Sequence, residues 1–229
     1  MSNITLYQYE ISPFCDKVRR TLKLKGQSFK TENISLLQTQ LGKVKKLGPA
    51  AKLPVLEIDG ERIADSSNIV EELEKRFPSP TVYPSDKRQQ ALVHFFEDWA
   101  DESLYFYEVY LRFVRNPKEW GKITSKEDHP AFAALSQHIA PGVLKKQVMA
   151  QGLARKPWAV VETDLHKHFQ SLSDWLEGQK YLCGDELTLA DISVAGQITC
   201  IIGTPEGKQI SSNYPTVSVW LQRVDDLTL

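Results

Sequence analysis

Cysteine and histidine are scarce in this chain of 229 residues, which has three of the first and five of the second. The cysteines, Cys15, Cys183 and Cys200, are widely spaced, so they suggest neither a disulfide framework nor the paired spacing of a zinc site. His166 and His168 lie two positions apart on a predicted helix and therefore do not face one another, which also argues against a metal site. Free thiols are typical of a reducing compartment, so we expect a cytoplasmic protein without a metal.

The chain also lacks an excess of charge of one sign and any long apolar run. Its net charge of −1 argues against nucleic acid or an anionic membrane as the main partner. No apolar run is long enough to span a bilayer, and the N-terminus has no signal-peptide pattern. A Gly-rich phosphate loop and a His-Glu-x-x-His motif are absent as well. With 41% apolar residues, the length predicts one large domain or two of ordinary size.

A strand, a turn and a helix are predicted at the start of the chain. Residues 4–9 alternate between apolar and polar side chains, which predicts a strand with one buried face. Apolar residues at Phe14, Val18 and Leu22 have helical spacing and predict a helix directly after the turn.

The turn carries the chemistry of this first segment. Ser12 is a preferred N-cap residue, and Pro13 suits the first position of the helix because its missing N–H would have no partner there. The Ser12 hydroxyl and the Cys15 thiol therefore lie near a helix N-terminus, where free N–H groups and the helix dipole favour a negative charge such as a sulfur anion. A plain helix cap is the alternative interpretation.

The first eighty residues continue with alternating strand and helix signals. Residues 29–34 predict a second strand, and a weak helix signal follows it. The dipeptide Asp59-Gly60 separates two short strand-like runs, which is the strongest local signal for a two-residue hairpin. Capping residues from Asp65 then precede an amphipathic helix that reaches Phe77. The order β-α-β-α-β-β-α predicts a complete α/β domain over residues 1–80.

Beyond residue 80 the strand signals fade. Residues 81–88 carry proline and serine and predict a linker, so residues 89–229 are expected to form an all-helical second domain. A long, mostly buried helix is expected at 89–113 and a loop between helices at 116–130. The other helix signals are apolar runs at 131–153 and 158–176, a capping box at Thr188 and Asp191, and a terminal helix that begins at Pro215.

Together these motifs resemble the cytosolic glutathione transferases over the whole chain. The resemblance rests on the order and spacing of Ser12-Pro13-Phe14-Cys15, Leu53-Pro54-Val55, Asp65-Ser66 and the Thr188/Asp191 box. It implies a thioredoxin-like α/β domain followed by an all-α domain, glutathione as co-substrate, and a homodimer. The Ser-Pro-Phe start is similar to that of the tau and zeta classes, and it matches the Cys-Pro-Phe of omega enzymes with serine in place of cysteine. Residues 116–156 are longer and more polar than expected of those classes, so the subclass stays open.

The resemblance also implies how the first domain binds glutathione. Leu53-Pro54-Val55 matches a turn with a cis proline that aims the Val55 backbone at the cysteinyl part of glutathione. Ser66, at a capped helix start, would hold the γ-glutamyl carboxylate, and Asp65 would pair with the ammonium. Lys52 would meet the glycyl carboxylate. The plain alternatives are a proline at a strand start, a helix cap and a solvated surface lysine.

Ser12 has a defined energetic task if the chain uses glutathione. A free thiol titrates near ~8.5, and lowering that pKa by about two units requires roughly 2.7 kcal/mol of preferential binding to the thiolate. A helix terminus typically contributes about 0.3–1 kcal/mol. A hydroxyl that donates to an ionised partner contributes about 1.5–3 kcal/mol, so Ser12 and the helix together are sufficient. We therefore expect Ser12 to activate glutathione as a hydrogen-bond donor, without becoming a nucleophile.

Two further features bear on the chemistry. Cys15 is either a resolving thiol that takes part in the reaction or a small buried residue on the inner face of its helix. Aromatic residues are plentiful in the regions expected near Ser12, and most of such a stripe belongs to a core. Among them, Phe14, Tyr107 and Tyr110 are predicted to line a pocket for a small hydrophobic electrophile. The full stripe consists of Tyr9, Phe14, Trp99, Tyr105, Phe106, Tyr107, Tyr110 and Phe113.

Three functions are consistent with the sequence. The leading one is a glutathione transferase that conjugates the thiolate to small hydrophobic electrophiles. A glutathione-dependent thiol reductase would need a cysteine nucleophile, for which only Cys15 is near the turn, and an isomerase of the zeta type would add and release glutathione at Ser12. The third is a scaffold that binds glutathione without turnover, because a fold does not determine a function.

Overall fold

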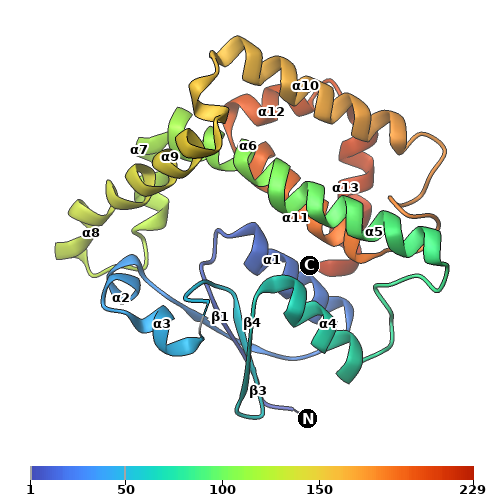
Figure 1. Cartoon of the computed structure of the whole chain (residues 1–229), viewed down its shortest axis with the longest axis horizontal. Helices are drawn as coiled ribbons and strands as arrows, with labels where there is room; N and C mark the ends of the chain where they lie inside the picture. Colours follow the sequence, from blue (N-terminus) through green and yellow to red (C-terminus); the bar gives the residue numbers. More distant parts are fainter. Residues whose placement is uncertain (1, 49) are drawn as a thin grey trace.

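The computed structural model describes residues 2–48 and 50–229, and it has a sheet-containing first half and a helical second half (Figure 1). The first half contains a four-stranded sheet in the order β2-β1-β3-β4, with β1 and β2 parallel and the other neighbours antiparallel. This is the predicted thioredoxin-like arrangement. Its elements are β1 (Ile4–Gln8), α1 (Pro13–Leu24), β2 (Lys30–Asn33), α2 (Leu36–Gln40), α3 (Lys43–Leu47), β3 (Val55–Ile58), β4 (Glu61–Ala64) and α4 (Ser66–Arg76).

The sheet forms where the sequence alternates. In β1 the side chains of Ile4 and Leu6 are buried while Thr5 and Tyr7 are partly exposed, so one face of the strand packs on α1 and α4. The hairpin between β3 and β4 turns at Asp59 and Gly60, which have φ values of 52° and 90°. Positive φ at both central residues is the type I′ geometry that an Asp-Gly pair favours, so the predicted hairpin is confirmed.

Strand register brings three predicted segments to one edge of the sheet. Tyr7, near the end of β1, pairs with Val55 at the start of β3, and Val55 pairs with Ala64 at the end of β4. The turn after β1, the turn before β3 and the start of α4 after β4 therefore leave the sheet on the same side. Ser12, Lys52 and Asp65 belong to these three segments.

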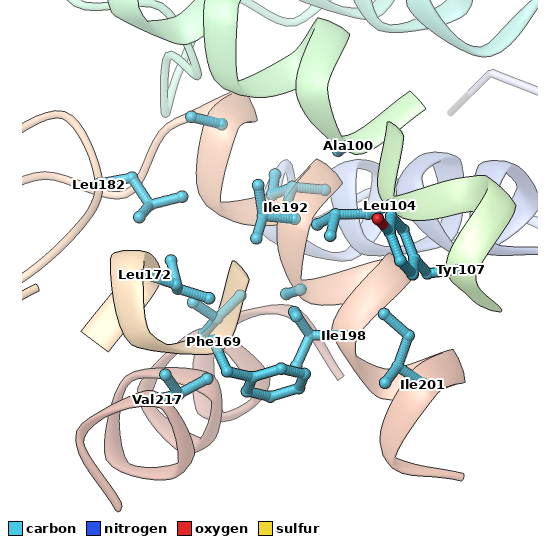
Figure 2. Packing of buried hydrophobic residues seen from close by; sticks show 14 of the residues in the cluster. Ala100, Leu104, Tyr107, Phe169, Leu172, Leu182, Ile192, Ile198, Ile201 and Val217 are labelled. Atoms are coloured by element: carbon cyan, nitrogen blue, oxygen red, sulfur yellow. The ribbon is translucent and has the colours of Figure 1, made fainter. Parts of the chain in front are cut away.

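The second half is built around one buried helix. Helix α11 (Leu189–Ile202) is buried along most of its length, and Figure 2 shows Ile192, Ile198 and Ile201 packed among side chains of the surrounding helices. The predicted capping box at Thr188 and Asp191 is confirmed. The other helices are α5 (Lys87–Trp99), α6 (Tyr105–Val109), α7 (Pro117–Thr124), α8 (Pro130–Ser136), α9 (Ile139–Gln151), α10 (Trp158–Trp175), α12 (Pro205–Ser211) and α13 (Pro215–Thr228), with a 3₁₀ turn at Leu153–Arg155.

Helix α1 joins the two halves. Its Lys17 side chain is ion-paired with Glu97, and its Arg20 side chain is ion-paired with Asp225 of α13 at 2.6 Å. Gly196 of α11 approaches α1 so closely that a Cβ there would lie 3.3 Å from the Pro13 carbonyl oxygen. The start of α1 is therefore held against the centre of the helical half.

Two predictions for the helical half are corrected, and one helix was missed. Residues 116–130 were expected to form a loop, but Pro117 begins α7, and Gly121 lets that helix pack against the Gln137 backbone, where a Cβ would lie only 2.1 Å from the carbonyl oxygen. The run 131–153 forms two helices, α8 and α9, in place of one. Helix α12 was not expected. Within the described ranges 2–48 and 50–229, none of the helices is long and apolar enough to cross a membrane.

The segment 81–88 is not a free linker along its whole length. Val82 is fully buried, and its carbonyl accepts a hydrogen bond from the Leu189 N–H at 2.9 Å. Helix α5 begins at Lys87, which is slightly earlier than expected. The division into residues 1–80 and 89–229 stays a prediction.

The long helix expected at 89–113 is continuous but not uniform. It runs from Lys87 to Arg115 and contains two π-helical segments, η1 (Ala100–Leu104) and η2 (Tyr110–Arg115), on either side of α6. Backbone bonds that reach five residues back, such as Asn116 N–H to Leu111 O at 3.1 Å, mark this geometry.

Candidate functional site

A cavity of about 540 Å³ lies between the sheet edge and the helical half. Its sheet side is formed by the turn after β1 (residues 9–14), by α2 with the end of β2, and by residues 51–53. Its helical side is formed by the helix that spans η1, α6 and η2, together with α7 and α9. Figure 1 shows α7, α8 and α9 gathered on one side of the molecule, next to α2. The cavity therefore opens where two of the three predicted segments leave the sheet.

Ser12 lies on the wall of this cavity and caps α1 as predicted. Its backbone is extended, with φ −81° and ψ 128°, and its Oγ accepts a long hydrogen bond from the Cys15 N–H at 3.5 Å. Its own N–H donates to the Tyr9 carbonyl at 3.1 Å, which closes the turn. Because the cap uses only an acceptor lone pair of Oγ, the hydroxyl hydrogen is available to donate to an anion in the cavity.

Cys15 does not reach the cavity. Its side chain is fully buried on the inner face of α1, and it is not among the residues that line the cavity. Burial raises the pKa of the Cys15 thiol to about 11, although the neighbouring Ser12 hydroxyl acts in the opposite direction. The thiol is thus inaccessible and neutral at physiological pH, which agrees with the second of the two interpretations, a small buried residue on the inner face of the helix.

The Leu53-Pro54 peptide bond is cis, as the motif predicts. Lys52 and Leu53 line the cavity, and the Lys52 side chain is exposed. Pro54 and Val55 are buried behind them and are not part of the lining. Among the predicted glutathione-binding residues, Lys52 and Leu53 are therefore the ones that share the cavity wall with Ser12.

Asp65 and Ser66 begin α4 at the same edge of the sheet but outside the cavity lining. Asp65 has a φ of 77°, and its Oδ1 accepts hydrogen bonds from the Ser67 N–H at 3.1 Å and the Asn68 N–H at 3.3 Å. Ser66 is the first helical residue and is 6% exposed. The predicted cap is present, and Asp65 itself provides it, so the carboxylate is partly committed to the helix.

The aromatic wall of the cavity differs from the prediction. Phe14 lines the cavity, and its ring centroid lies 5.1 Å from that of Tyr105, which in turn lies 5.3 Å from Phe106. Tyr107 packs against His168 in the core, where Figure 2 shows it beside Leu104. Tyr110 stacks on Trp158. Neither tyrosine lines the cavity, so the prediction is corrected for Tyr107 and Tyr110.

Helical spacing accounts for this difference. The residues of the long helix that line the cavity recur three or four positions apart and so share one face of the helix. Tyr107 and Tyr110 lie on its other face, toward His168 and Trp158. The lining residues of this helix are Asp101, Glu102, Tyr105, Phe106, Glu108, Val109, Arg112 and Phe113.

Two tyrosines offer neutral hydroxyl groups on opposite walls. The Tyr9 hydroxyl is 2.6 Å from Thr39 Oγ1, and burial raises the pKa of Tyr9. The Tyr105 hydroxyl donates a weak hydrogen bond to Gln147 at 3.5 Å, and burial raises the pKa of Tyr105 to about 12. Both groups therefore stay protonated through the neutral range and can act as neutral donors.

Accessible charge on the helical side of the cavity is negative. Glu102 and Glu127 line this side and are exposed. The cationic side chain on the same wall, Arg112, is only 2% exposed and is ion-paired with the equally buried Glu108 at 2.9 Å. A ligand that enters the cavity from this side meets carboxylates and apolar surface.

Two family models match the chain. One, described as "Glutathione S-transferase, N-terminal domain", covers residues 6–81, and the other, "Glutathione S-transferase, C-terminal domain", covers residues 157–226. Together they account for more than half of the 229 residues and include the turn that carries Ser12.

Individual proteins resemble the chain over nearly its full length. An isoprene-epoxide–glutathione S-transferase from Rhodococcus sp. is 25% identical, covering 96% of this chain and 97% of its own. A maleylacetoacetate isomerase from Rattus norvegicus is 27% identical, covering 93% and 83%. Among solved structures, a beta-etherase from Sphingobium superposes with a TM-score of 0.71 at 20% identity, covering 97% of this chain and 95% of its own, which is a likeness of fold.

Proposed function

Since this chain belongs to the glutathione S-transferase family, we propose that it conjugates the thiolate of glutathione to small hydrophobic electrophiles. The observation that carries the proposal is the position of Ser12, which caps the N-terminus of α1 and lines the same cavity as the aromatic residues Tyr105 and Phe106. An anion bound at Ser12 and an apolar electrophile packed against the aromatic wall would therefore lie next to each other in one cavity.

In this mechanism Ser12 donates a hydrogen bond to the sulfur of glutathione. The helix dipole of α1 adds about 0.3–1 kcal/mol, and a hydroxyl-to-anion bond about 1.5–3 kcal/mol. The sum is close to the roughly 2.7 kcal/mol that a decrease of about two units in the thiol pKa requires. The sulfur then attacks the electrophilic carbon of the second substrate and forms the thioether, while the leaving group departs or the epoxide oxygen takes up a proton from solvent.

The peptide part of glutathione is proposed to lie along the sheet edge. Lys52, which lines the cavity, would meet the glycyl carboxylate, and the Val55 backbone would pair with the cysteinyl part. Asp65 and Ser66 directly follow Ala64, which pairs with Val55 across the hairpin. Ser66 would bind the γ-glutamyl carboxylate and Asp65 the ammonium. Because Asp65 also caps α4, its pairing with the ammonium would use the oxygen that the cap leaves free.

The electrophile is proposed to be neutral. The carboxylates of Glu102 and Glu127 would repel a substrate that carries carboxylates. The guanidinium of Arg112 would not attract it, because that charge is buried and paired with Glu108. The isomerase function of some relatives, in which glutathione adds and leaves again, is therefore the second candidate, and it is supported only by the similarity over 93% of the chain. The Rhodococcus relative is named for an epoxide of a hydrocarbon, which is a neutral electrophile.

The two other functions have less support. A thiol reductase would need an accessible thiolate, and Cys15 is fully buried with a raised pKa. A scaffold that binds glutathione without turnover would retain the cavity but would not need its aromatic wall. We also propose a homodimer in a reducing cytoplasm, which sedimentation of the purified chain and localisation of the tagged protein test separately.

A panel of three assays tests the proposal. It consists of conjugation of an activated chlorodinitrobenzene, reduction of a mixed disulfide with glutathione, and thermal unfolding with and without glutathione. We expect conjugation, no disulfide reduction above the uncatalysed rate, and a higher Tm with glutathione. A Tm increase without turnover on any electrophile favours the scaffold, and the absence of both contradicts every glutathione-based function.

A further inference from the structure

We propose that Arg112 is a positioning residue for the reaction: from the helical half, its guanidinium holds the Ile11–Ser12 peptide and so fixes the Ser12 hydroxyl toward the sulfur. The inference rests on the proposed function, because it concerns the same sulfur site. Arg112 itself would not touch either substrate.

The contact that carries this inference crosses between the two halves of the chain. Arg112 Nη2 donates a hydrogen bond of 2.9 Å to the carbonyl oxygen of Ile11. That oxygen and the backbone nitrogen of Ser12 belong to one planar peptide unit, so a donor that fixes the oxygen also fixes the plane from which Ser12 begins. The thiol of Cys200 on α11 lies 3.9 Å from the same oxygen and adds a weak second contact.

The guanidinium is itself held on three sides. Nη1 donates to Glu108 Oε2 at 2.9 Å, Nη2 donates to Ile11, and the carbon of the guanidinium lies 4.0 Å from the centroid of the Trp120 ring. Arg112 and Glu108 are both almost completely buried. The planar guanidinium can contact the carboxylate, the carbonyl and the aromatic face together in one orientation only. The ammonium group of a lysine is not planar and cannot make the same three contacts.

Burial separates positioning from ligand binding. Arg112 contributes to the wall of the cavity, but its side chain is 2% exposed, and its Nε atom is buried without a hydrogen-bond partner among the described residues. A ligand in the cavity therefore has no polar atom of this side chain within easy reach. Arg112 therefore acts by fixing the position of the turn that carries Ser12, and it does not present a charge to the ligand.

The consequence for the reaction follows from geometry. A hydrogen bond to the sulfur anion stabilises it only when the hydroxyl is aimed at the sulfur, and a displacement of about 1 Å is enough to lose much of a well-placed catalytic contact. Without Arg112 the turn between β1 and α1 keeps its Ser12 N–H to Tyr9 O bond but loses the 2.9 Å hydrogen bond from the helical half, so the Ile11 carbonyl keeps only the weak contact with Cys200 among the described residues. We therefore expect a higher thiol pKa in bound glutathione, with the contacts to the peptide part retained.

The test compares two arginines of the same π-helical segment. Arg112→Met removes the contact to Ile11, whereas Arg115→Met serves as the matched control. Arg115 also pairs with a glutamate, Glu206 at 3.0 Å, and also lies over a tryptophan ring, Trp158 at 4.3 Å, but it does not contact the turn. Because loss of a buried ion pair can prevent folding, Arg112→Lys is included; it keeps a cation for Glu108 but has no planar fork for the Ile11 carbonyl.

Each protein is measured for the pH profile of kcat/KM in conjugation of a chlorodinitrobenzene, for the KM of glutathione, for the thiolate absorbance of bound glutathione, and for Tm. In both Arg112 variants we expect the apparent thiol pKa to rise toward the free value, with about a tenfold loss of kcat at neutral pH, a KM within about threefold of the unsubstituted chain, and recovery at high pH. The Arg115→Met profile should match that of the unsubstituted chain.

Two results would overturn the inference in distinguishable ways. A lower Tm in the Arg112 variants with an unchanged pH profile and unchanged thiolate absorbance would make Arg112 a purely structural residue. If the unsubstituted chain itself shows no thiolate signal and no conjugation, the proposed function fails, and the positioning role fails with it.

Discussion

Lys17 Nζ lies 2.6 Å from Asp101 Oδ2, so the first helix of the sheet half is ion-paired with the helix that forms the aromatic wall of the cavity. The same ammonium contacts Glu97 at 3.1 Å, and Glu97 accepts a hydrogen bond from the Ser67 hydroxyl at 2.8 Å. Three elements that border the site, α1, α4 and the long helix, thus meet at one nearly buried cation. Burial raises the pKa of Asp101 to about 6, although Lys17 acts in the opposite direction.

The raised pKa predicts how stability depends on pH. A folded chain in which Asp101 binds a proton more readily than in the unfolded chain loses stability as pH rises from about 4 to about 6. Asp101→Asn removes this contribution. We expect the decrease in unfolding free energy over that range to be smaller in the variant, by at most roughly 3 kcal/mol, as measured by urea denaturation at several pH values.

Asp98→Asn is the control for this prediction, because Asp98 lies on the same helix with an exposed side chain. Its stability curve should run parallel to that of the unsubstituted chain. If the Asp101→Asn curve is parallel as well, Asp101 does not titrate in this range.

Local signals were sufficient to predict the Ser12 cap and the Thr188/Asp191 box, which each depend on residues close in sequence, and the structure contains both. The cis Leu53-Pro54 bond, which is also present, was implied by the resemblance to the family. The helical wall depends on packing instead. Aromatic residues occur on both faces of the long helix, and the sequence does not indicate which face meets the cavity, so Tyr107 and Tyr110 were assigned to the wrong face.

Contacts between distant residues could not be predicted for a related reason. The hydrogen bond from Arg112 to the Ile11 carbonyl joins residues 101 positions apart, and periodicity gives no information on such pairs. Helix α7 was missed because its sequence is polar and contains proline and glycine. Pro117 occupies the first position of the helix, and Gly121 allows the helix to contact the Gln137 backbone.

Burial of Cys15 predicts that its thiol is dispensable and unreactive. We expect Cys15→Ala to keep the pH profile of conjugation while losing about 1 kcal/mol of stability from the small cavity it leaves. Mass spectrometry after brief treatment of the folded chain with a thiol-alkylating reagent should find Cys15 unmodified, and fully modified after unfolding. Rapid alkylation in the folded state would reopen the reductase function.

The carboxylates on the helical wall predict a preference for neutral electrophiles. A chlorodinitrobenzene should react with a higher kcat/KM than its benzoate analogue, which carries one extra carboxylate, relative to the uncatalysed rates of the two compounds. The exposed carboxylates Glu102 and Glu127 repel the benzoate, so Glu127→Gln should raise its kcat/KM about two- to fivefold with little change for the neutral compound.

Glu119→Gln is the matched control, because Glu119 is exposed on α7 but does not line the cavity. It should leave the ratio of the two substrates unchanged. Equal use of both electrophiles by the unsubstituted chain would contradict the proposed neutral substrate class and would favour the isomerase.

Lys52 on the sheet side predicts a contribution to glutathione binding alone. An exposed ion pair with the glycyl carboxylate contributes about 0.2–1 kcal/mol, so Lys52→Met should raise the KM of glutathione about two- to fivefold while kcat stays nearly constant. The effect should diminish at high salt. Lys45→Met, on the exposed face of α3, is the control; a KM that does not differ between the two variants would remove Lys52 from the site.

The central claim is that the Ser12 hydroxyl stabilises the thiolate of bound glutathione. Its most direct test is the titration of that thiolate by ultraviolet difference absorbance, in the unsubstituted chain and in Ser12→Ala. We predict a thiol pKa about two units below the free value in the first, and a rise of about one to two units in the second, because the variant keeps the helix dipole but lacks the donor. The same low pKa in both proteins would contradict the assignment of Ser12.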